Sequence, residues 1–217
     1  MSSLYHLKRE IRYNLLKKRD EISPSQHTRF SLAAARNANK INALSNGKNI
    51  SGTIISAFNS IHSEIDTRPL ISSLLKRKAR LCLPVVIDSI RIEFREISED
   101  MKLIKSRLDT FGPPLNPEIL VIPLSGFDRR GGRIGYGAGL YDRAIIKLRT
   151  QIYSQKSVIK PLLCGFAFSI QEVQKIPMDK HDQFLDYIVT EIEVIDCLLY
   201  RKIKGYEGGF DLCEFSS

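Results

Sequence analysis

The sequence has few cysteines and none of the cysteine spacings that mark a metal or redox site. Four cysteines occur in 217 residues, at Cys82, Cys164, Cys197 and Cys213, and no two of them form a CxxC pair. Two of them lie in apolar runs, where a small buried thiol is the usual state. The sequence therefore predicts neither a zinc site nor a disulfide framework, and it fits a reducing cytoplasm.

Long apolar runs are also missing. No stretch approaches the roughly 20 apolar residues of a membrane-spanning helix, and the N-terminal segment is charged and helical in pattern, unlike a signal peptide. We therefore expect a cytoplasmic protein without a membrane partner.

The chain has no internal repeat and no low-complexity segment. Because no Ser-His-Asp or Cys-His arrangement occurs at a readable spacing, covalent nucleophilic catalysis has no support.

Negative charge is in the minority, since 33 lysines and arginines outnumber 24 aspartates and glutamates to give a net charge of +9. A field of this sign attracts polyanions, which include nucleic acid, a membrane surface and anionic small substrates such as nucleotides. A merely basic, soluble surface has the same composition, so charge alone does not choose. With 43% apolar residues the chain can bury an ordinary core. We predict one domain over residues 1–200 and a tail at 201–217.

Apolar periodicity predicts strands that alternate with helices. Residues 3–21 have the spacing of a basic amphipathic helix, and Ser23, Pro24 and Gln26 predict the start of a second helix over 24–44. The alternation implies an α/β fold with a mostly parallel or mixed sheet that is covered on both faces. The other predicted elements are helices over 67–78 and from 138–140 to 149, and strands over 50–58, 81–86, 90–97, 119–124, 161–168 and 187–190.

A stretch rich in glycine and arginine, FDRRGGRIGYGAGLYDR at residues 127–143, lies between the strand at 119–124 and the next helix. It matches neither GxxxxGK followed by Ser or Thr nor GxGxxG. Glycine lets backbone N–H groups approach an oxyanion closely, and arginine supplies a fork of donors that matches phosphate. A strand, such a loop and a helix N-terminus form a phosphate-binding arrangement. The stretch therefore predicts a phosphate site, with a flexible hairpin as the alternative.

Two acidic side chains are candidate metal ligands. Asp142 lies about one turn into the helix, where its carboxylate either reaches bound phosphates through Mg²⁺ or simply favours the positive helix end. Asp186, just before the last predicted strand, is well placed to complete a metal site. His181 beside Asp182 is more typical of a structural hydrogen-bond partner than of a ligand.

Two other segments carry candidate binding residues. Lys8 and Arg12 are spaced i and i+4 on the first helix, so they either project together toward an anion or belong to a solvated face. Glu64 lies in the polar loop that follows the first strand. Open α/β sheets place their ligand sites at that position, so Glu64 is a candidate ligand-binding residue.

These motifs together resemble one enzyme family. Residues 128–143 are similar to the fingerprint of the 5-formyltetrahydrofolate cyclo-ligases, also called methenyltetrahydrofolate synthetases, which reads roughly FDxxGxRLGYGGGYYDR. The resemblance extends to the K-R-x-x-R pattern at residues 8–12, to Glu64-Ile65-Asp66-Thr67, and to the segment over residues 181–191. Four motifs in the family's order are more specific than the glycine-rich stretch alone.

The resemblance implies a single three-layer α/β domain, expected to be monomeric, that uses ATP and Mg²⁺ to convert 5-formyltetrahydrofolate into 5,10-methenyltetrahydrofolate with release of ADP and phosphate. In such a reaction the formyl oxygen takes the γ-phosphoryl group, N10 attacks the activated carbon, and phosphate leaves. Arg133 and Tyr141 are the implied catalytic residues, and Asp142 and Asp186 are the implied Mg²⁺ ligands. The residues implied to bind ATP are Lys8, Arg9, Arg12, Arg133, Ile134, Gly135, Tyr136, Gly137, Ala138, Gly139, Leu140 and Tyr141. Those implied to bind the folate are Asn59, Glu64, Tyr136, Gly137, Ala138, Gly139 and Leu140.

Two positions depart from the family's pattern. Ala138 replaces the middle glycine of GYGGGYYD, and Leu140 replaces its first tyrosine. Leucine can neither stack as an aromatic ring does nor donate a hydrogen bond. If that tyrosine contacts the folate in the family, this chain should bind the folate differently or more weakly.

Two other functions compete with this interpretation. A nucleic-acid-binding module would use the basic first helix and would show a steep salt dependence of binding. However, the basic residues are not interleaved with aromatic ones, and no helix-turn-helix or RNP-like pattern occurs, so we expect no nucleic-acid partner. An α/β phosphotransferase or sugar-phosphate enzyme is the other competitor, and it would turn over ATP without folate.

Overall fold

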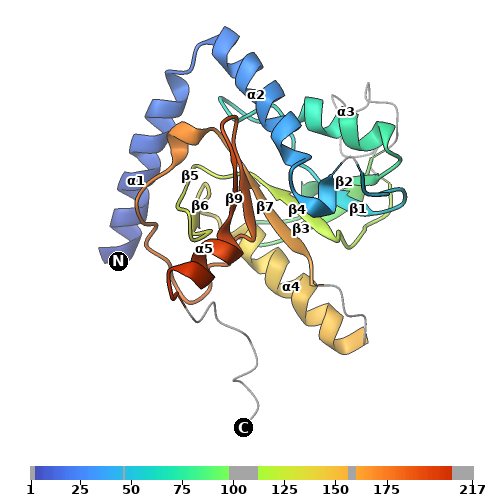
Figure 1. Cartoon of the computed structure of the whole chain (residues 1–217). Helices are drawn as coiled ribbons and strands as arrows, with labels where there is room; N and C mark the ends of the chain where they lie inside the picture. Colours follow the sequence, from blue (N-terminus) through green and yellow to red (C-terminus); the bar gives the residue numbers. More distant parts are fainter. Residues whose placement is uncertain (1–2, 46, 98–111, 156–159, 207–217) are drawn as a thin grey trace.

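A mixed β-sheet organises the chain, as the computed structural model shows for residues 3–45, 47–97, 112–155 and 160–206 (Figure 1). Within these residues the sheet has seven strands in the order β3-β2-β1-β4-β7-β8-β9. The five inner strands run parallel, and the two edge strands are antiparallel to their neighbours. The predicted α/β fold with a mostly parallel sheet is therefore confirmed. The strands are β1 (Ile54–Ser56), β2 (Arg80–Val86), β3 (Ile92–Glu96), β4 (Ile119–Ile122), β7 (Leu162–Phe166), β8 (Tyr187–Val189) and β9 (Val194–Asp196).

Helices cover the sheet on both faces. Apolar side chains of α2 and α3 pack on one face, and those of α4 pack on the other, in two separate buried clusters. Figure 1 shows α2 and α3 on one side of the strands and α4 and α5 on the opposite side, which gives three layers. The helices are α1 (Ser3–Asp20), α2 (Pro24–Ala38), α3 (Arg68–Lys76), α4 (Leu140–Gln155) and α5 (Cys197–Ile203), with short 3₁₀ turns η1 (Asn42–Leu44) and η4 (Ser169–Gln171).

The start of α2 follows directly from its sequence. The Ser23 hydroxyl accepts the backbone N–H of Gln26 at 3.3 Å, and the Gln26 side chain accepts the backbone N–H of Ser23 at 3.1 Å. This reciprocal pair is a capping box, which satisfies donors that the first helical turn leaves free. The predicted start is therefore confirmed. The helix ends at Ala38 rather than at residue 44, and η1 completes the predicted range.

The first strand is shorter than the predicted range of 50–58. Gly52 has φ of +79°, a left-handed conformation that interrupts an extended strand. The backbone N–H of Thr53 donates to the Ile50 carbonyl at 3.0 Å, so a turn replaces the expected strand before Ile54. Ile50 is still buried, which explains why its apolar character suggested a strand residue.

Several short elements were not predicted. A two-stranded hairpin of β5 (Gly126–Phe127) and β6 (Arg133–Ile134) lies inside the glycine-rich stretch. β9 and α5 follow the strand at Tyr187–Val189 that we predicted to be the last. Because α5 extends to Ile203, it crosses the predicted domain boundary at residue 200. Most of the predicted tail, residues 207–217, lies outside the described residues.

The cysteines behave as the sequence indicates. Cys82, Cys164 and Cys197 are buried free thiols, and Cys213 lies outside the described residues. Burial raises the pKa of Cys82 and of Cys164 to about 12, so these thiols are protonated and unreactive at neutral pH. In the part of the chain that the structure describes, no helix has both the length and the apolar composition needed to cross a membrane.

The sheet topology identifies where a ligand site should form. β1 connects through α3 to β2 on one side, whereas β4 connects through α4 to β7 on the other side. The strand order therefore reverses between β1 and β4, and open α/β sheets bind ligands outside the carboxyl ends of strands at such a switch point. The loop at residues 57–67 and the glycine-rich stretch both leave the sheet there.

Candidate active site

A buried aspartate shapes the first half of the glycine-rich stretch. Asp128 has no exposed surface, and its Oδ1 accepts the backbone N–H groups of Arg130 at 2.9 Å and Gly132 at 3.2 Å. Its Oδ2 accepts the N–H of Ile176 at 2.7 Å. Gly131 at the tip has φ of +88°, and a Cβ there would overlap the carbonyl oxygen of Leu185. This half of the stretch is therefore a fixed turn rather than a phosphate cradle.

The three arginines of the stretch have different surroundings. Arg129 pairs with Glu172 at 2.8 Å and with Glu193 at 2.5 Å, and Arg130 pairs with Asp128 at 2.6 Å. These contacts direct both side chains toward neighbouring loops. Arg133, at the start of β6, is the member of the three that lines the pocket described next.

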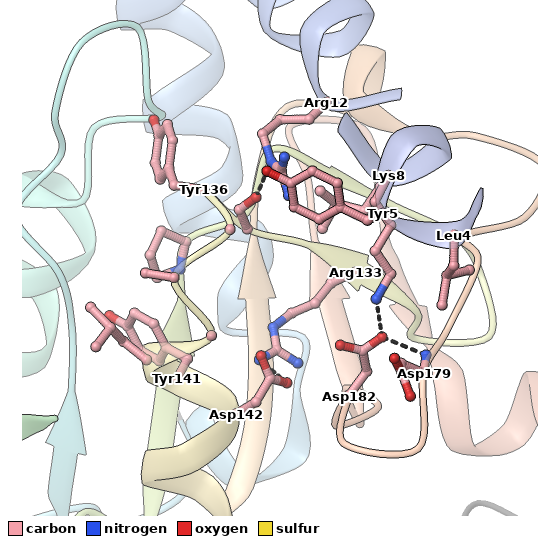
Figure 2. Close-up of a pocket in the computed structure, with 17 residues that line it drawn as sticks. Leu4, Tyr5, Lys8, Arg12, Arg133, Tyr136, Tyr141, Asp142, Asp179 and Asp182 are labelled. Carbon is pink, nitrogen blue, oxygen red and sulfur yellow. Dashed lines mark hydrogen bonds and ion pairs between the residues drawn. The ribbon is translucent and has the colours of Figure 1, made fainter. Parts of the chain in front are cut away.

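A pocket of about 430 Å³ lies between α1, the second half of the glycine-rich stretch and the loop at residues 179–182. Figure 2 shows side chains from these three segments facing the same space. The stretch contributes backbone and small side chains, α1 contributes cations, and the loop contributes carboxylates. The lining residues are Leu4, Tyr5, Lys8, Arg12, Pro123, Arg133, Ile134, Gly135, Tyr136, Gly137, Ala138, Gly139, Leu140, Tyr141, Asp142, Asp179 and Asp182.

Two of the three pocket cations are paired with carboxylates (Figure 2). Lys8 on α1 contacts Asp182, and Arg133 contacts Asp142 at 2.8 Å. Asp142 also accepts the backbone N–H of Gln183 at 2.9 Å, which ties the first turn of α4 to the loop that carries Asp182. These pairs hold long side chains in place at the pocket wall.

Arg12 is the pocket cation that no carboxylate of the described residues pairs with. Its Nε donates to the carbonyl oxygen of Gly135 at 2.6 Å, so α1 is fastened to the glycine-rich wall. Burial lowers the pKa of this guanidinium, which still titrates far above neutral pH. Its remaining donors make Arg12 the cation that is most available to an anion.

The structure gathers most of the predicted ATP-binding residues. Lys8, Arg12 and the whole segment from Arg133 to Tyr141 line the pocket, together with Asp142. Arg9 and Asn59 are exposed and do not belong to this lining. Their predicted binding roles therefore stay predictions.

Asp186 lies apart from this lining. It is buried, its Oδ2 accepts the backbone N–H of Leu163 at 2.8 Å, and burial raises its pKa. The structure thus shows Asp186 joining β8 to β7. Among the described residues, no group of three or more His, Cys, Asp or Glu side chains is arranged to hold a metal ion. The pocket supplies Asp142 from the predicted metal pair, and the role of Asp186 stays a prediction.

A second polar cluster surrounds Glu64, in the loop after β1. Glu64 is 4% exposed, its Oε2 accepts the N–H of Ile61 at 2.9 Å, and its Oε1 has no hydrogen-bond partner. Burial raises the pKa of this carboxyl group, and the N–H of Ile61 and the charge of Arg19 oppose the rise. The Tyr141 hydroxyl is likewise buried without a partner, and burial raises its pKa. Unsatisfied buried atoms of this kind mark a place that a polar ligand can complete.

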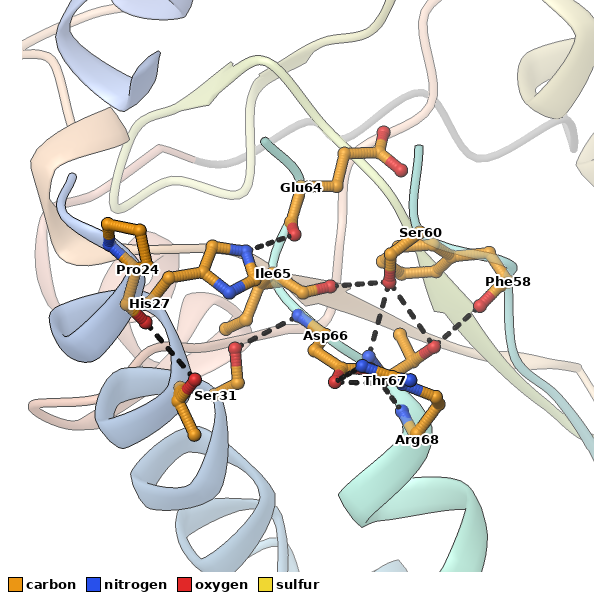
Figure 3. Close-up of polar contacts among 11 residues, drawn as sticks. Pro24, His27, Ser31, Phe58, Ser60, Glu64, Ile65, Asp66, Thr67 and Arg68 are labelled. Atoms are coloured by element: carbon orange, nitrogen blue, oxygen red, sulfur yellow. Dashed lines mark hydrogen bonds and ion pairs between the residues drawn. The ribbon is translucent and has the colours of Figure 1, made fainter. Parts of the chain in front are cut away.

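Hydrogen bonds fix the backbone that presents Glu64 (Figure 3). His27 Nε2 contacts the Glu64 carbonyl at 2.7 Å, and the Ser60 hydroxyl donates to the Ile65 carbonyl at 2.7 Å. The Thr67 hydroxyl donates to the Phe58 carbonyl at 2.6 Å instead of capping α3. Asp66 Oδ1 accepts the N–H of Arg68 at 2.9 Å. The Glu64 carboxylate points away from this network, toward the side of the glycine-rich loop.

Sequence reasoning missed three residues of the two clusters. No role was predicted for Arg19 beyond its place on the basic first helix, and none was predicted for Asp179 or for Asp182 in the pocket. A signal for Arg19 was present, since Lys8, Arg12 and Arg19 follow a helical repeat of four and seven residues and so share one face of α1. The two aspartates carried no such signal because the loop at 179–182 has no periodicity.

The fold and the pocket define an α/β protein with a pocket lined by charged side chains at a topological switch point. The sequence profile of the 5-formyltetrahydrofolate cyclo-ligase family matches residues 5–191. The chain is 30% identical over 151 residues to the 5-formyltetrahydrofolate cyclo-ligase of Escherichia coli K12. The matched region covers 64% of this chain and 79% of that protein. The chain is 25% identical over 202 residues to the mouse cyclo-ligase, which covers 85% of this chain and 93% of that one.

Solved structures agree with this match. The 5,10-methenyltetrahydrofolate synthetase of Aquifex aeolicus superimposes with a TM-score of 0.67 at 28% identity, over 88% of this chain and 93% of that one. The synthetase of Mycoplasma pneumoniae has the same fold, with a TM-score of 0.65 at 21% identity over 85% of this chain and 98% of that one. The chain therefore belongs to the 5-formyltetrahydrofolate cyclo-ligase family, which makes it an enzyme of folate one-carbon metabolism. Membership in this family implies that the enzyme uses ATP.

Proposed function

We propose that this enzyme closes the ring of 5-formyltetrahydrofolate to 5,10-methenyltetrahydrofolate in a reaction that depends on ATP and Mg²⁺ and proceeds through a phosphorylated formyl group. One observation carries the proposal. The segment Arg133–Tyr141 forms a wall of the pocket, and its Tyr136 hydroxyl accepts a hydrogen bond from Arg19 at 3.0 Å. Arg19 in turn donates to the hydroxyl of Ser63, the chain neighbour of Glu64 in the second cluster, at 3.0 Å. A single wall thus joins a phosphate site to a buried polar site.

The proposed chemistry balances in three steps. The formyl oxygen attacks the γ-phosphorus, the bond to the β-phosphate oxygen breaks, and ADP leaves. The N10 lone pair then attacks the formyl carbon, which the phosphate ester has made electrophilic. Loss of inorganic phosphate and of the N10 proton gives the methenyl bridge. The protein has no covalent role in this sequence, so catalysis depends on positioning and on charge stabilisation.

The three cations of the pocket supply the charge stabilisation. Lys8 and Arg12 on α1 and Arg133 on β6 approach the pocket from two sides, so a triphosphate between them would contact donors along its length. Arg133 is 7% exposed and is fixed by Asp142, so it can stabilise developing charge without reorganising. In this proposal Arg133 and Tyr141 lie at the reacting end, next to the folate cluster.

The charge balance of the lining suits a divalent cation. Lys8, Arg12 and Arg133 are matched by the carboxylates of Asp142, Asp179 and Asp182, so the protein alone offers little net positive charge to four phosphate charges. Mg²⁺ prefers one or two carboxylates together with phosphate oxygens. Asp142 would hold it, and the ion would neutralise phosphate charge during transfer. Asp186, the second predicted ligand, would have to release the N–H of Leu163 to take part.

The polar cluster around Glu64 supplies the folate side. Glu64 would accept hydrogen bonds from the pterin, while residues 136–140 would form the shared wall and Asn59 would lie at its edge. Leu140 lines the pocket in the position of the family's tyrosine, so this part of the wall is apolar.

An absorbance assay tests the proposed function. Mixing the enzyme with 5-formyltetrahydrofolate, ATP and Mg²⁺ should produce the methenyl chromophore, and omission of any component should prevent it. Asp142→Asn should lower the rate by about 10-fold or more because it removes the carboxylate that fixes Arg133 and Mg²⁺. Asp88→Asn, on the exposed β2–β3 turn, is the matched control. No chromophore from a folded enzyme under these conditions would refute the proposal.

A further inference from the structure

Two buried side chains of opposite charge beside the pocket each keep an unsatisfied atom. Arg19 is 2% exposed and Glu64 is 4% exposed. Neither Nη1 of Arg19 nor Oε1 of Glu64 has a hydrogen-bond partner among the described residues. Such an atom costs about 1–3 kcal/mol when it is buried, and more when the group is charged. A protein that retains two of them at one place gains most when a ligand satisfies both.

The other atoms of both side chains are firmly held. Arg19 Nε donates to the Ser63 hydroxyl at 3.0 Å, and Nη2 donates to the Tyr136 hydroxyl at 3.0 Å. Glu64 Oε2 accepts the N–H of Ile61 at 2.9 Å. Contacts from α1, from the glycine-rich wall and from the loop after β1 therefore orient both groups before any ligand binds. One guanidinium donor and one carboxylate oxygen are left over.

The two charges are near each other without touching. No ion pair within 4.0 Å joins Arg19 to Glu64, although both belong to the described part of the chain. Arg19 Nε bonds the hydroxyl of Ser63, the chain neighbour of Glu64, at 3.0 Å, which places the two charges close together. In agreement, the positive charge of Arg19 opposes the rise that burial causes in the pKa of Glu64. The Tyr136 hydroxyl accepts from Arg19 Nη2 and also interacts with Glu64. Arg19 Nη1 and Glu64 Oε1 are the atoms left without partners, and they suit a planar group that has a hydrogen-bond acceptor and donors on adjacent atoms.

We propose that Arg19 is a specificity-determining residue that reads the pyrimidinone edge of the pterin together with Glu64. This inference rests on the proposed function. The edge presents the C4 oxygen as an acceptor, directly beside the N3–H and 2-amino donors. Nη1 of Arg19 donates to the C4 oxygen, and Oε1 of Glu64 accepts from the donors. Arg19 thereby selects a 4-oxo pterin over a 4-amino pterin, whose donor at C4 would face the guanidinium.

Binding measurements with two ligands test this role. Calorimetric titrations would compare 5-formyltetrahydrofolate with its analogue in which an amino group replaces the C4 oxygen, using wild type, Arg19→Met, Arg19→Lys and the exposed-charge control Lys17→Met. Arg19→Met should weaken binding of 5-formyltetrahydrofolate by roughly 10- to 100-fold, as expected for a charged hydrogen bond. The same variant should weaken binding of the 4-amino analogue by less than about 3-fold, since that ligand offers no acceptor at C4. The Lys17→Met control should bind both ligands as the wild type does.

The outcomes separate specificity from structure. Equal weakening of both ligands by Arg19→Met and Arg19→Lys would show that Arg19 only supports Tyr136 and Ser63, and it would overturn the inference, as would no weakening at all. If Arg19→Met lowers the melting temperature, the binding of the two ligands is compared in Arg19→Lys instead, because this variant keeps the charge and one donor nitrogen. Failure of the wild type to bind either folate would count against the proposed function instead.

Discussion

The pocket residues are held in place by pairs that a phosphate can replace. Lys8 contacts Asp182 and Arg133 contacts Asp142, which fixes two flexible cations before a ligand arrives. Side chains of Lys8 and Asp182 are about one-fifth exposed, and pairs near solvent contribute only about 1 kcal/mol or less. An incoming phosphate can therefore take over these donors at little cost. Arg12, bonded to a carbonyl, offers further donors without breaking an ion pair.

Glu64 should make stability depend on pH in a characteristic direction. Burial raises its pKa above the ordinary value of 4.5, so the folded protein binds this proton more tightly than the unfolded chain does. Its contribution to the free energy of unfolding is therefore present below the unfolded-state pKa and is lost as pH rises through the folded-state pKa. Each pKa unit between the two states is worth about 1.4 kcal/mol. The Glu64→Gln variant should not lose stability in this way as pH rises, because its amide does not titrate. Its amide oxygen can still accept the N–H of Ile61.

Urea unfolding of wild type and Glu64→Gln between pH 4 and pH 7 measures this effect. The stability of the variant relative to wild type should increase with pH, while its affinity for the folate falls. A stability difference that does not change with pH would contradict a raised pKa at Glu64.

At the same scale, the sequence identified some site residues and not others. Composition alone did not distinguish Arg133 from Arg129 and Arg130, because all three precede the tyrosine in one glycine-rich run; only the resemblance to the family fingerprint singled out Arg133. Their roles diverge through distant partners, since Glu172 and Glu193 pair with Arg129 from other loops. Lys8 and Arg12 were recognisable because their spacing on a helix fixes their common direction.

Among the elements, the glycine-rich stretch has two parts with different structural roles. Residues 126–132 form a turn that Asp128 fixes and that contacts the loop before β8 through Leu185. Residues 133–141 form the pocket wall. The first part is thus a fixed turn and not the flexible hairpin that was the alternative, and phosphate binding by the second part stays a prediction.

Two alanine substitutions should separate these parts. Gly131→Ala should lower the free energy of unfolding by more than about 2 kcal/mol, because alanine is strained at φ of +88° and its Cβ would overlap the Leu185 backbone. Gly135→Ala should change stability by less than about 0.5 kcal/mol, since no heavy atom lies within 4 Å of its Cβ position. Urea denaturation measures both values. Equal stability of the two variants would mean that Gly131 is not needed for the turn.

Prediction of the elements succeeded where local signals were strong. The capping box at Ser23 gave the start of α2. Residues 90–97 alternate apolar and charged side chains, as a half-exposed edge strand does, and β3 lies at the edge of the sheet. The hairpin of β5 and β6 has two residues in each strand, too few to show a period, and it depends on Asp128 bonding to Ile176 far along the chain. Such elements are specified by tertiary contacts rather than by local pattern.

For the whole molecule, the switch point of the sheet brings the pocket and the polar cluster around Glu64 to one wall. β1 leads to Glu64 and β4 leads to the pocket, while α1 supplies Lys8 and Arg12 to one site and Arg19 to the other. The α/β class followed from the alternation of helices and strands. The placement of α1 across both loops could not be predicted, because it depends on contacts such as Arg12 with Gly135 that join distant segments. The monomeric state stays a prediction.

In the proposed mechanism, the transfer of the γ-phosphoryl group to the formyl oxygen is the step that requires both sites to share this wall. It can be followed with 5-formyltetrahydrofolate that carries ¹⁸O in the formyl group, by mass spectrometry of the inorganic phosphate after a single turnover. The proposed mechanism predicts that the label appears in inorganic phosphate, with one ¹⁸O atom for each molecule of methenyl product. Unlabelled phosphate, with the ¹⁸O released into water, would contradict it.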